Sequence, residues 1–286
     1  MYILLVFVAL RSVFIILLIL VSVILGVSIF LDRPSNLMRV SFLDVGQGDS
    51  ILVEVPNGNQ LLVDAGVDSR VLHQLGKSMR WFDRSIDFAI ATHADEDHIG
   101  GFPAIFEVYK IGKFVIQSTD RNDELLKILQ EKEVLFGEEL YQGDRLILDF
   151  DREIFVDVFW PPKGEEFSNR NDGSYALKIS YGEVEFFLTG DLPESVEEKL
   201  VSLYGEKISS DILKAGHHGS KTSSSEIFLS TVKPKYGIIS AGKENRYGHP
   251  SQEVLDRFSN LNIEIFRTDQ EGSVVFETDG FEIWKK

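Results

Sequence analysis

The chain has 286 residues, of which 44% are hydrophobic and 26% charged, and this composition is typical of a folded protein. It contains no cysteine, which excludes disulfide bonds and thiolate metal sites, so any metal must be held by His, Asp or Glu. The net charge of −16 disfavours a broad electrostatic grip on nucleic acid. It does not exclude phosphate contacts that run through bound metal ions.

The N-terminal segment has the composition of a membrane anchor. Residues 3–31 are apolar except for Arg11 and a few serines, and Ser12–Leu31 contains no charge. A run of this length corresponds to about one bilayer crossing. The sequence therefore predicts an anchor over 1–34, with contact to the cytoplasmic membrane through residues 3–31. A cleaved signal peptide is the alternative, but the residues that follow the run are a poor cleavage site.

The charges that flank this segment predict its orientation. Arg11 and the N-terminal amine lie on one side, and Asp32 and Arg33 lie on the other. The weak positive-inside bias favours an N-terminus in the cytoplasm. We therefore expect a single-pass anchor in the cell membrane and a domain over 35–286 that lies outside the cytoplasm.

The first half of this domain is predicted to combine strands with helices. We expect strands at Met38–Val45, Ile51–Val55, Gln60–Val63, Ile86–Ala91 and Lys113–Gln117, helices at Asp68–Lys77, Phe102–Val108 and Glu124–Lys132, and a strand-like pattern over Val134–Trp160. Asn57-Gly58, between the second and third strands, is a strong hairpin signal. Asp68 is a candidate cap for the first helix.

The second half repeats this strand-rich pattern. We expect strands at Tyr175–Tyr181, Glu183–Leu188, Asp211–Ala215, Tyr236–Ser240, Ile263–Phe266, Ser273–Glu277 and Phe281–Trp284, and helices at Pro193–Tyr204, Glu226–Val232 and Ser251–Phe258. Proline suits the first turn of a helix and serine suits the capping position, so Pro193 and Ser251 mark two helix starts. The polar stretch Lys163–Arg170 predicts a surface loop near the site.

One short stretch concentrates candidate metal ligands. The sequence Ala-Thr-His-Ala-Asp-Glu-Asp-His-Ile-Gly-Gly at 91–101 contains His93, Asp95, Asp97 and His98. Imidazoles and carboxylates together suit a divalent transition metal. The spacing does not place the four side chains on one helical face. His93, Asp95 and Asp97 alternate, so we expect an extended loop that aims these three together. His98 follows Asp97 directly, which suits two ligands that point to neighbouring sites. The alternative is a solvated acidic turn with two ordinary histidines.

Five of the six histidines occupy the same kind of position. His93, His98, His217, His218 and His249 each lie in a loop after a predicted strand, beside Gly or Asp. Asp64 and Asp191 also end predicted strands, whereas His73 lies within a predicted helix and is expected to be an ordinary packing or surface residue. Strand ends that meet at one rim are where layered folds build their sites. The pattern therefore predicts a metal site.

Six motifs carry a resemblance to a known family. They are Phe42–Ser50, Leu62–Gly66, Thr92–Gly101, Leu188–Asp191, Leu213–Ser220 and Asn245–Pro250. Together they resemble the metallo-β-lactamase superfamily, and most of all the metallo-β-lactamase-like domain of ComEC-type competence proteins. The resemblance implies an α/β fold, the αβ/βα four-layer sandwich of that superfamily, with the site along one edge between two β-sheets. The multi-span membrane channel of ComEC proteins is missing here.

The resemblance also implies residue roles. The expected metal ligands are His93, Asp95, Asp97, His98, Asp191 as the bridging carboxylate, and His249. His217 and His218 match the paired histidines of the family, of which at least one should face the metals. The wider superfamily usually has a histidine where Asp95 stands. A second histidine, expected before Asp191, is also missing, and Asn171 or Asp172 occupies that region.

These departures bear on the metal. With Asp95 in place of a histidine, one metal position is rich in oxygen, which favours manganese or another hard divalent ion there, or a site that fills weakly. We expect one or two divalent ions, zinc or manganese, with magnesium as an alternative.

The expected ligands define an expected chemistry. A hydroxide that bridges two metals would attack a phosphorus or carbonyl centre. Asp97 is expected to orient it, and His217 or His218 to donate a proton or bind a substrate oxygen. Supporting or substrate-binding roles are expected for Asp64, Asp49, Asn171, Ser220, Lys221, Asn245 and Tyr247. Four cations beside the late motifs are candidate phosphate contacts: Lys214, Lys221, Lys243 and Arg246.

The functional hypothesis is a metal-dependent hydrolase. The ligand pattern predicts hydrolysis, and the resemblance implies a phosphodiesterase or nuclease that acts on DNA in competence or DNA uptake. A hydrolase of a small ester, lactone or cyclic phosphodiester is the first alternative, and a narrow pocket without a basic groove would favour it. A non-catalytic module that binds nucleic acid or another ligand is the second. The sequence indicates no oligomeric state.

Overall fold

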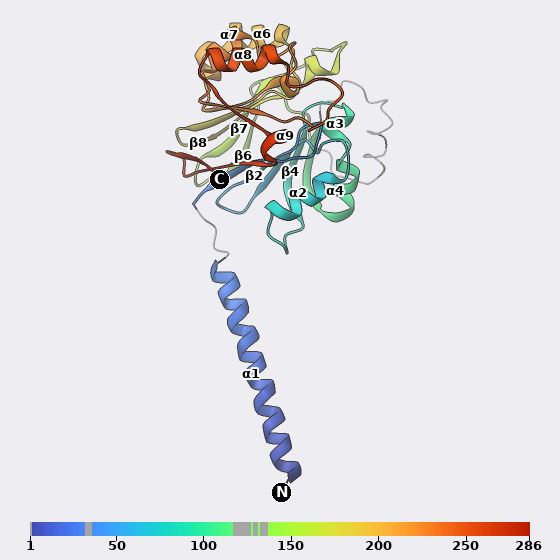
Figure 1. The fold of residues 1–286 in the computed structure, drawn as a ribbon, viewed down its shortest axis with the longest axis vertical. Coiled ribbons are helices and arrows are strands. Elements are labelled where there is room, and N and C mark those ends of the chain that lie inside the picture. The colour runs from blue at the N-terminus through green and yellow to red at the C-terminus, as the bar shows by residue number, and fades with distance from the viewer. Residues whose placement is uncertain (1, 32–35, 117–126, 128–130, 132–136) are drawn as a thin grey trace. The chain divides into compact units, whose positions relative to one another are not determined.

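The computed structural model describes residues 2–31, 36–116, 127, 131 and 137–286 (Figure 1). The chain divides into two compact units, Met1–Ser35 and Asn36–Lys286, within one residue of the predicted domain boundary. The first unit is a single helix, α1 (Tyr2–Leu31). No helix within the described residues is both long and apolar enough to cross a membrane. The transmembrane span predicted from the sequence is therefore not confirmed.

The second unit is built on two seven-stranded sheets. In spatial order, the first contains β14 (Ile283–Lys285), β13 (Val274–Thr278), β1 (Met38–Phe42), β2 (Ile51–Glu54), β3 (Gln60–Val63), β4 (Ser85–Ala91) and β5 (Lys110–Ile116). The second contains β12 (Glu264–Arg267), β11 (Tyr236–Ile239), β10 (Ile212–Lys214), β9 (Val184–Leu188), β8 (Ala176–Tyr181), β7 (Ile154–Trp160) and β6 (Arg145–Asp149). The C-terminal strands return to the first sheet, where β13 pairs antiparallel with β1.

Helices cover the outer face of each sheet (Figure 1). The first sheet carries α2 (Arg70–Ser78) and α4 (Phe102–Val108), and the second carries α6 (Glu194–Tyr204), α7 (Glu226–Val232) and α8 (Gln252–Asn260). One apolar core lies between the two sheets. A second lies between the first sheet and its helices, and a third lies between the second sheet and its helices. This is the αβ/βα sandwich that the resemblance implied. Strands β3 and β10 are buried along their whole length because both of their faces are covered.

Most predicted elements are confirmed with small shifts at their ends. The strand over 60–63 and the helices over 102–108 and 226–232 have the predicted bounds. The serine cap of α8 is confirmed, since Val254 N donates to Ser251 Oγ at 3.3 Å. Pro193 is the residue before α6 and not part of its first turn. The hairpin at Asn57-Gly58 joins the antiparallel strands β2 and β3.

Two regions differ from the predictions, and a third prediction is not tested. The strand-like pattern over 134–160 resolves into β6 and β7, with an irregular segment over 137–144. The predicted helix over 124–132 lies outside the described residues except at 127 and 131. Several one-turn helices were not predicted, and they include α3 (Glu96–Ile99), α9 (Thr268–Glu271) and the 3₁₀ turn η3 (Gly216–Gly219). A single turn contains too few residues to show a helical period.

The directions of the strands bring the loops that carry the predicted site residues to one edge of the fold. Strands β3, β4 and β5 run parallel to one another, and β9 to β12 form a second parallel set. The carboxyl ends of parallel strands meet at one edge of a sheet. The segments that follow β3, β4, β9, β10 and β11 therefore supply side chains to a common rim.

Candidate metal centre

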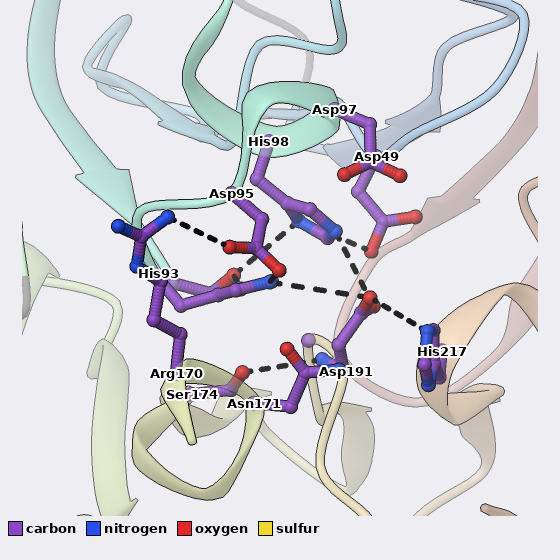
Figure 2. A network of polar contacts seen from close by, with 12 residues as sticks. Asp49, His93, Asp95, Asp97, His98, Arg170, Asn171, Ser174, Asp191 and His217 are labelled. Carbon is purple, nitrogen blue, oxygen red and sulfur yellow. Dashed lines mark hydrogen bonds and ion pairs between the residues drawn. The ribbon is translucent and has the colours of Figure 1, made fainter. Parts of the chain in front are cut away.

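Six side chains from both sheets form what we call the histidine–aspartate centre. They are His93, Asp95, Asp97, His98, Asp191 and His218. His93 follows β4, Asp97 and His98 lie on α3, Asp191 follows β9, and His218 lies in η3. Figure 2 shows His93, His98 and Asp191 pointing toward one another from these separate elements.

The metal-ligand motif is partly helical. Asp95 has extended dihedrals at the start of α3, and Asp97 and His98 lie within that single turn. The prediction of an extended loop is therefore wrong for the second half of the motif. The turn is packed closely, because a side chain at Gly100 would collide with Val67 O and one at Gly101 with Ala65 O. The two glycines after His98 are required by this packing.

Each imidazole of the centre is oriented through its Nδ1 atom. His98 Nδ1 donates to Asp64 Oδ2 at 2.8 Å, and His218 Nδ1 donates to the Ser240 carbonyl at 3.1 Å. His93 Nδ1 lies 3.0 Å from Thr92 Oγ1, whose hydroxyl donates to Asp64 Oδ2. Because Nδ1 carries the proton in this arrangement, the lone pair of each ring lies on Nε2.

The three Nε2 atoms converge on Asp191. The distance to the nearer Asp191 oxygen is 3.3 Å from His98, 3.6 Å from His218 and 4.0 Å from His93. These Nε2 atoms and Asp191 Oδ1 are buried and have no hydrogen-bond partner among the residues that the structure describes. Buried polar atoms without partners cost about 1–3 kcal/mol each, so their convergence indicates a ligand that satisfies them. A divalent cation fits a set of imidazole nitrogens and carboxylate oxygens.

Two groups of ligand atoms could each hold an ion. One is His93, His98 and Asp191, and the other is Asp97, His98 and His218; within each group the ligand atoms lie within 4.8 Å of one another. A single imidazole nitrogen has one lone pair, so His98 serves only one of the two positions at a time. With two ions bound, the position that lacks His98 must take a further ligand from its surroundings.

A lysine supplies a fixed cation at the edge of the centre. Two further groups of ligand atoms include Asp49, but Asp49 is already ion-paired with Lys214 Nζ. Both residues are fully buried, and the Lys214 ammonium also donates to Gly190 O at 3.1 Å. The prediction that Lys214 contacts substrate phosphate is therefore wrong. Lys214 ends a strand of fully buried residues, and the apolar residues before it in the sequence are the signal for this burial.

The electrostatics of the centre favour cations. Although burial opposes the charged forms, His218 and His98 hold the pKa of Asp97 at about 2, and the same two histidines hold the pKa of Asp191 well below its usual range. Burial likewise lowers the pKa of His218, but Asp191 and Asp49 overcome this and raise it to about 9. Asp97 and Asp191 are therefore ionised at neutral pH, and the carboxylates around His218 favour a positive charge at that position.

The sequence profile of the metallo-beta-lactamase superfamily matches residues 43–243, which contain all six residues of this centre. The chain belongs to the metallo-β-lactamase superfamily. Known superfamily structures share its fold. The chain aligns with Tm1679, a metal-dependent hydrolase of the beta-lactamase superfamily, at a TM-score of 0.52 and 14% sequence identity. The alignment covers 80% of this chain and 95% of Tm1679. Zinc-bound PqqB from Methylobacterium extorquens aligns at 0.52 and 11% identity, over 77% and 85% of the two chains.

Competence proteins are among the similar sequences. ComE operon protein 3 of Bacillus subtilis is 32% identical over 260 residues, which cover 83% of this chain and 33% of that protein. Competence protein ComA of Neisseria gonorrhoeae is 32% identical over 244 residues, with coverages of 85% and 33%. Recombination protein 2 of Haemophilus influenzae is 30% identical, with coverages of 85% and 29%. The chain thus spans about a third of the length of these relatives.

The site departs from the superfamily pattern where the sequence indicated. Asp95, in the place of the usual histidine, lies 3.6 Å from His93 Nε2 and accepts a hydrogen bond from Arg170 Nη1 at 3.2 Å. Asn171 and Ser174 lie beside Asp191 in Figure 2, and Asp191 N donates to Ser174 Oγ at 3.4 Å. An oxygen-rich environment therefore surrounds the first ion position, as expected.

The structure separates the paired histidines. His218 is almost fully buried and contributes to the second ligand group, whereas His217 is one-third exposed, with Nε2 3.7 Å from Asp191 Oδ2. Both residues have a left-handed backbone conformation, with φ of 48° for His217 and 54° for His218. His249, the expected late ligand, lies farther out: its ring centroid is 5.8 Å from that of His217, and the ligand groups found among the described residues do not include it.

The remaining predicted residues lie in the surrounding shell of the centre. Asp64 and Asp49 position His98 and Lys214. Ser220 Oγ contacts the Thr222 hydroxyl at 2.9 Å, and Lys221 is exposed. Asn245 shapes its own loop by donating to Gly242 O and His249 O, and Tyr247 stacks on the His249 ring. Thr92, Arg170 and Ser174 were missed; each lies within three residues of a predicted site residue, which is the only sequence signal for them.

Proposed function

We propose that the protein is a metal-dependent phosphodiesterase that cleaves DNA. The observation that carries this proposal is the convergence of three buried, partnerless Nε2 atoms on Asp191. The superfamily to which the chain belongs consists largely of metal-dependent hydrolases, and one similar sequence is named as a competence protein and another as a recombination protein. Those names support DNA as the substrate.

The residues of the centre have separate roles in such a reaction. A divalent ion bound at either ligand group would polarise a phosphoryl oxygen of the substrate. It would also make a water molecule a stronger nucleophile at neutral pH. His93, His98 and His218 fix the ligand geometry, because each ring is held through Nδ1. Asp191 lies between the groups and is the expected bridge.

Two side chains remain open to substrate. The side chain of Asp97 is 28% exposed and ionised at neutral pH, so its second oxygen can accept a hydrogen bond from the attacking water and orient it. Burial lowers the pKa of His217, which therefore stays neutral at pH 7 and can donate a hydrogen bond to a substrate oxygen. This assigns His217 to substrate contact and His218 to ligation.

Activity measurements on the full-length protein test the proposal. With Mn²⁺, Zn²⁺ or Mg²⁺ added, we expect cleavage of single-stranded DNA and of bis(p-nitrophenyl) phosphate. Asp97→Ala and Asp191→Ala should lower kcat/KM by about 100-fold or more, since even residues behind the ligands contribute 10- to 100-fold. Asp256→Ala, on the exposed surface of α8, is the matched control and should retain activity.

Three results would change the assignment. Activity on the small diester alone would favour a small-molecule hydrolase. Metal binding with no turnover by wild type or variants would favour a binding module. Equal activity of wild type and Asp191→Ala would remove the centre from the mechanism.

We also propose that residues 3–31 hold the protein at the cytoplasmic membrane, with the second unit outside the cytoplasm. The support is the uncharged run Ser12–Leu31 and the position of Arg11. The measurement is carbonate extraction of membranes combined with protease treatment of intact cells. Release of the protein by carbonate would contradict the proposal.

A further inference from the structure

A polar cleft lies beside the histidine–aspartate centre and has no role in the chemistry described so far. Its volume is about 600 Å³, and it lies between the start of α2, the loop after β1 and the loop after β11. Arg70 and His73 line it from α2, and Lys243 and Asn245 line it from the 242–245 loop. Three of these side chains, Arg70, His73 and Lys243, can donate hydrogen bonds to a ligand in this space, whereas Asn245 already donates to Gly242 O and His249 O.

The floor of the cleft is built from two glycines. A side chain at Gly46 would collide with the Arg70 guanidinium, and Gly46 has a left-handed φ of 81°. A Cβ at Gly242 would lie 2.9 Å from Gln47 N, and Gly242 N donates to Gln47 Oε1 at 3.2 Å. The two loops are thus joined at the base, so the cleft has a defined shape and an accessible backbone.

The cationic groups of the cleft have donors to spare. The side chain of Arg70 is 56% exposed, and its Nε bonds Asp68 while its two Nη groups lie over Gly46. Lys243 and His73 are exposed, and within the described residues no ion pair involves either. Arginine and lysine with unused donors are the side chains that bind phosphate.

The local charge differs from that of the whole protein. The fixed charges that line the cleft are Arg70, Lys243, Asp44 and Glu244, which sum to zero, whereas the chain carries −16. Asp44 is turned into its own loop, where its carboxylate accepts from Gly46 N at 3.2 Å. An anion approaching the centre therefore meets less repulsion here than over an average part of the surface.

The cleft is close enough to the centre to contact the same substrate. Gly46 lines the cleft and Asp49 contacts His218 at 3.4 Å, and the three residues from one to the other can span at most about 11 Å. A single small diester at the centre would leave the cleft empty. A strand with successive phosphates can occupy both places.

We infer that this cleft binds a backbone phosphate of a nucleic-acid strand whose neighbouring phosphodiester lies at the histidine–aspartate centre. Arg70 and Lys243 supply the charge, His73 supplies a further donor, and the glycine floor lets the strand approach closely. The inference rests on the proposed function, to which it adds the recognition of a polymer. It also explains how a strongly acidic protein can hold nucleic acid through a small local surface.

The test compares two double variants of the full-length protein. Arg70→Gln/Lys243→Gln removes both charges from the cleft. Arg84→Gln/Lys233→Gln makes the same change at the opposite rim, since these residues precede the amino ends of β4 and β11. With Mn²⁺, kcat/KM is measured for a single-stranded oligonucleotide and for bis(p-nitrophenyl) phosphate. We expect the ratio of the two values to fall about tenfold or more in the cleft variant and to stay unchanged in the control.

Binding provides a readout that does not depend on turnover. In chelator, fluorescence anisotropy gives the affinity for a labelled single strand over a range of salt concentrations. Loss of the one phosphate that the cleft neutralises should reduce the slope of log K against log salt by about 0.7 in the cleft variant. An unchanged slope and an unchanged activity ratio would overturn the inference. A wild type that binds with this slope but cleaves neither substrate would instead contradict the proposed function alone.

Discussion

At the residue scale, the centre depends on which atom of each histidine carries the proton. Asp64 accepts from Thr92 N, Thr92 Oγ1 and His98 Nδ1, and it has a left-handed φ of 60°. A non-glycine residue in that region is strained, and such strain persists where surrounding contacts fix it. Asp64 therefore orients His98 directly and His93 through Thr92, without reaching the ligand positions itself.

The buried pair Lys214–Asp49 gives a prediction about stability. Lys214→Met leaves Asp49 charged and buried without its partner, which should lower the free energy of unfolding by about 3–5 kcal/mol. Lys214→Met/Asp49→Asn removes both charges and should recover a large part of that loss. Urea unfolding in chelator measures both values. Lys221→Met, at an exposed position, is the control and should change stability by less than about 0.5 kcal/mol. A loss below 1 kcal/mol for Lys214→Met would contradict the argument.

At the element scale, a buried glutamate joins the helices behind η3. Glu197 on α6 accepts from Ser224 N at 2.6 Å and from Ser225 N at 2.8 Å, just before α7 begins. Arg257 on α8 donates to the carbonyls of Ser223 and Ser224. These contacts fix the segment that follows the two histidines. Three helices of the outer layer therefore support one side of the centre.

Glu197 also gives a prediction about pH. Burial raises the pKa of this carboxyl to about 7, so the folded state holds its proton more tightly than the unfolded state does. The associated stability is present below about pH 4.5 and is lost as pH rises to about 7. We expect Glu197→Gln to remove a decline of at most about 3 kcal/mol over this window.

The measurement is urea unfolding of wild type and Glu197→Gln at several pH values between 4.5 and 7. Glu198→Gln, at the neighbouring exposed position, is the matched control and should keep the wild-type slope. Parallel pH profiles for wild type and Glu197→Gln would show that the carboxyl is not protonated in the folded state.

At the scale of the whole molecule, the centre ties the two halves of the sandwich together. His93, Asp97 and His98 come from the first sheet and its loops, whereas Asp191 and His218 come from the second. An ion that binds ligands from both halves is bound by the folded state and not by the unfolded chain. Metal binding and the stability of the second unit should therefore be linked.

Removing the metal tests this linkage. At a free ion concentration 100 times Kd, binding should raise the free energy of unfolding by about 2.7 kcal/mol, and chelator should reverse the gain. Calorimetry of the protein with and without Mn²⁺ or Zn²⁺ measures the effect. Asp191→Asn should show a much smaller gain, and Asp256→Asn on α8 should show the full one. An equal gain in Asp191→Asn and wild type would place the ion elsewhere.

The sequence by itself determined the strand and helix order, the family and the set of residues that meet at the rim. These features follow from local sequence patterns, which are apolar runs, a hairpin signal, helix caps and histidines that follow strands. It could not decide which side chain faces which, because that depends on contacts between segments far apart in the chain. Only the tertiary structure showed that His218 points inward and His217 outward, and that His249 lies outside the ligand groups. It also showed that Lys214 is buried against Asp49. In each case the decision depends on packing between the two sheets, which no local pattern records.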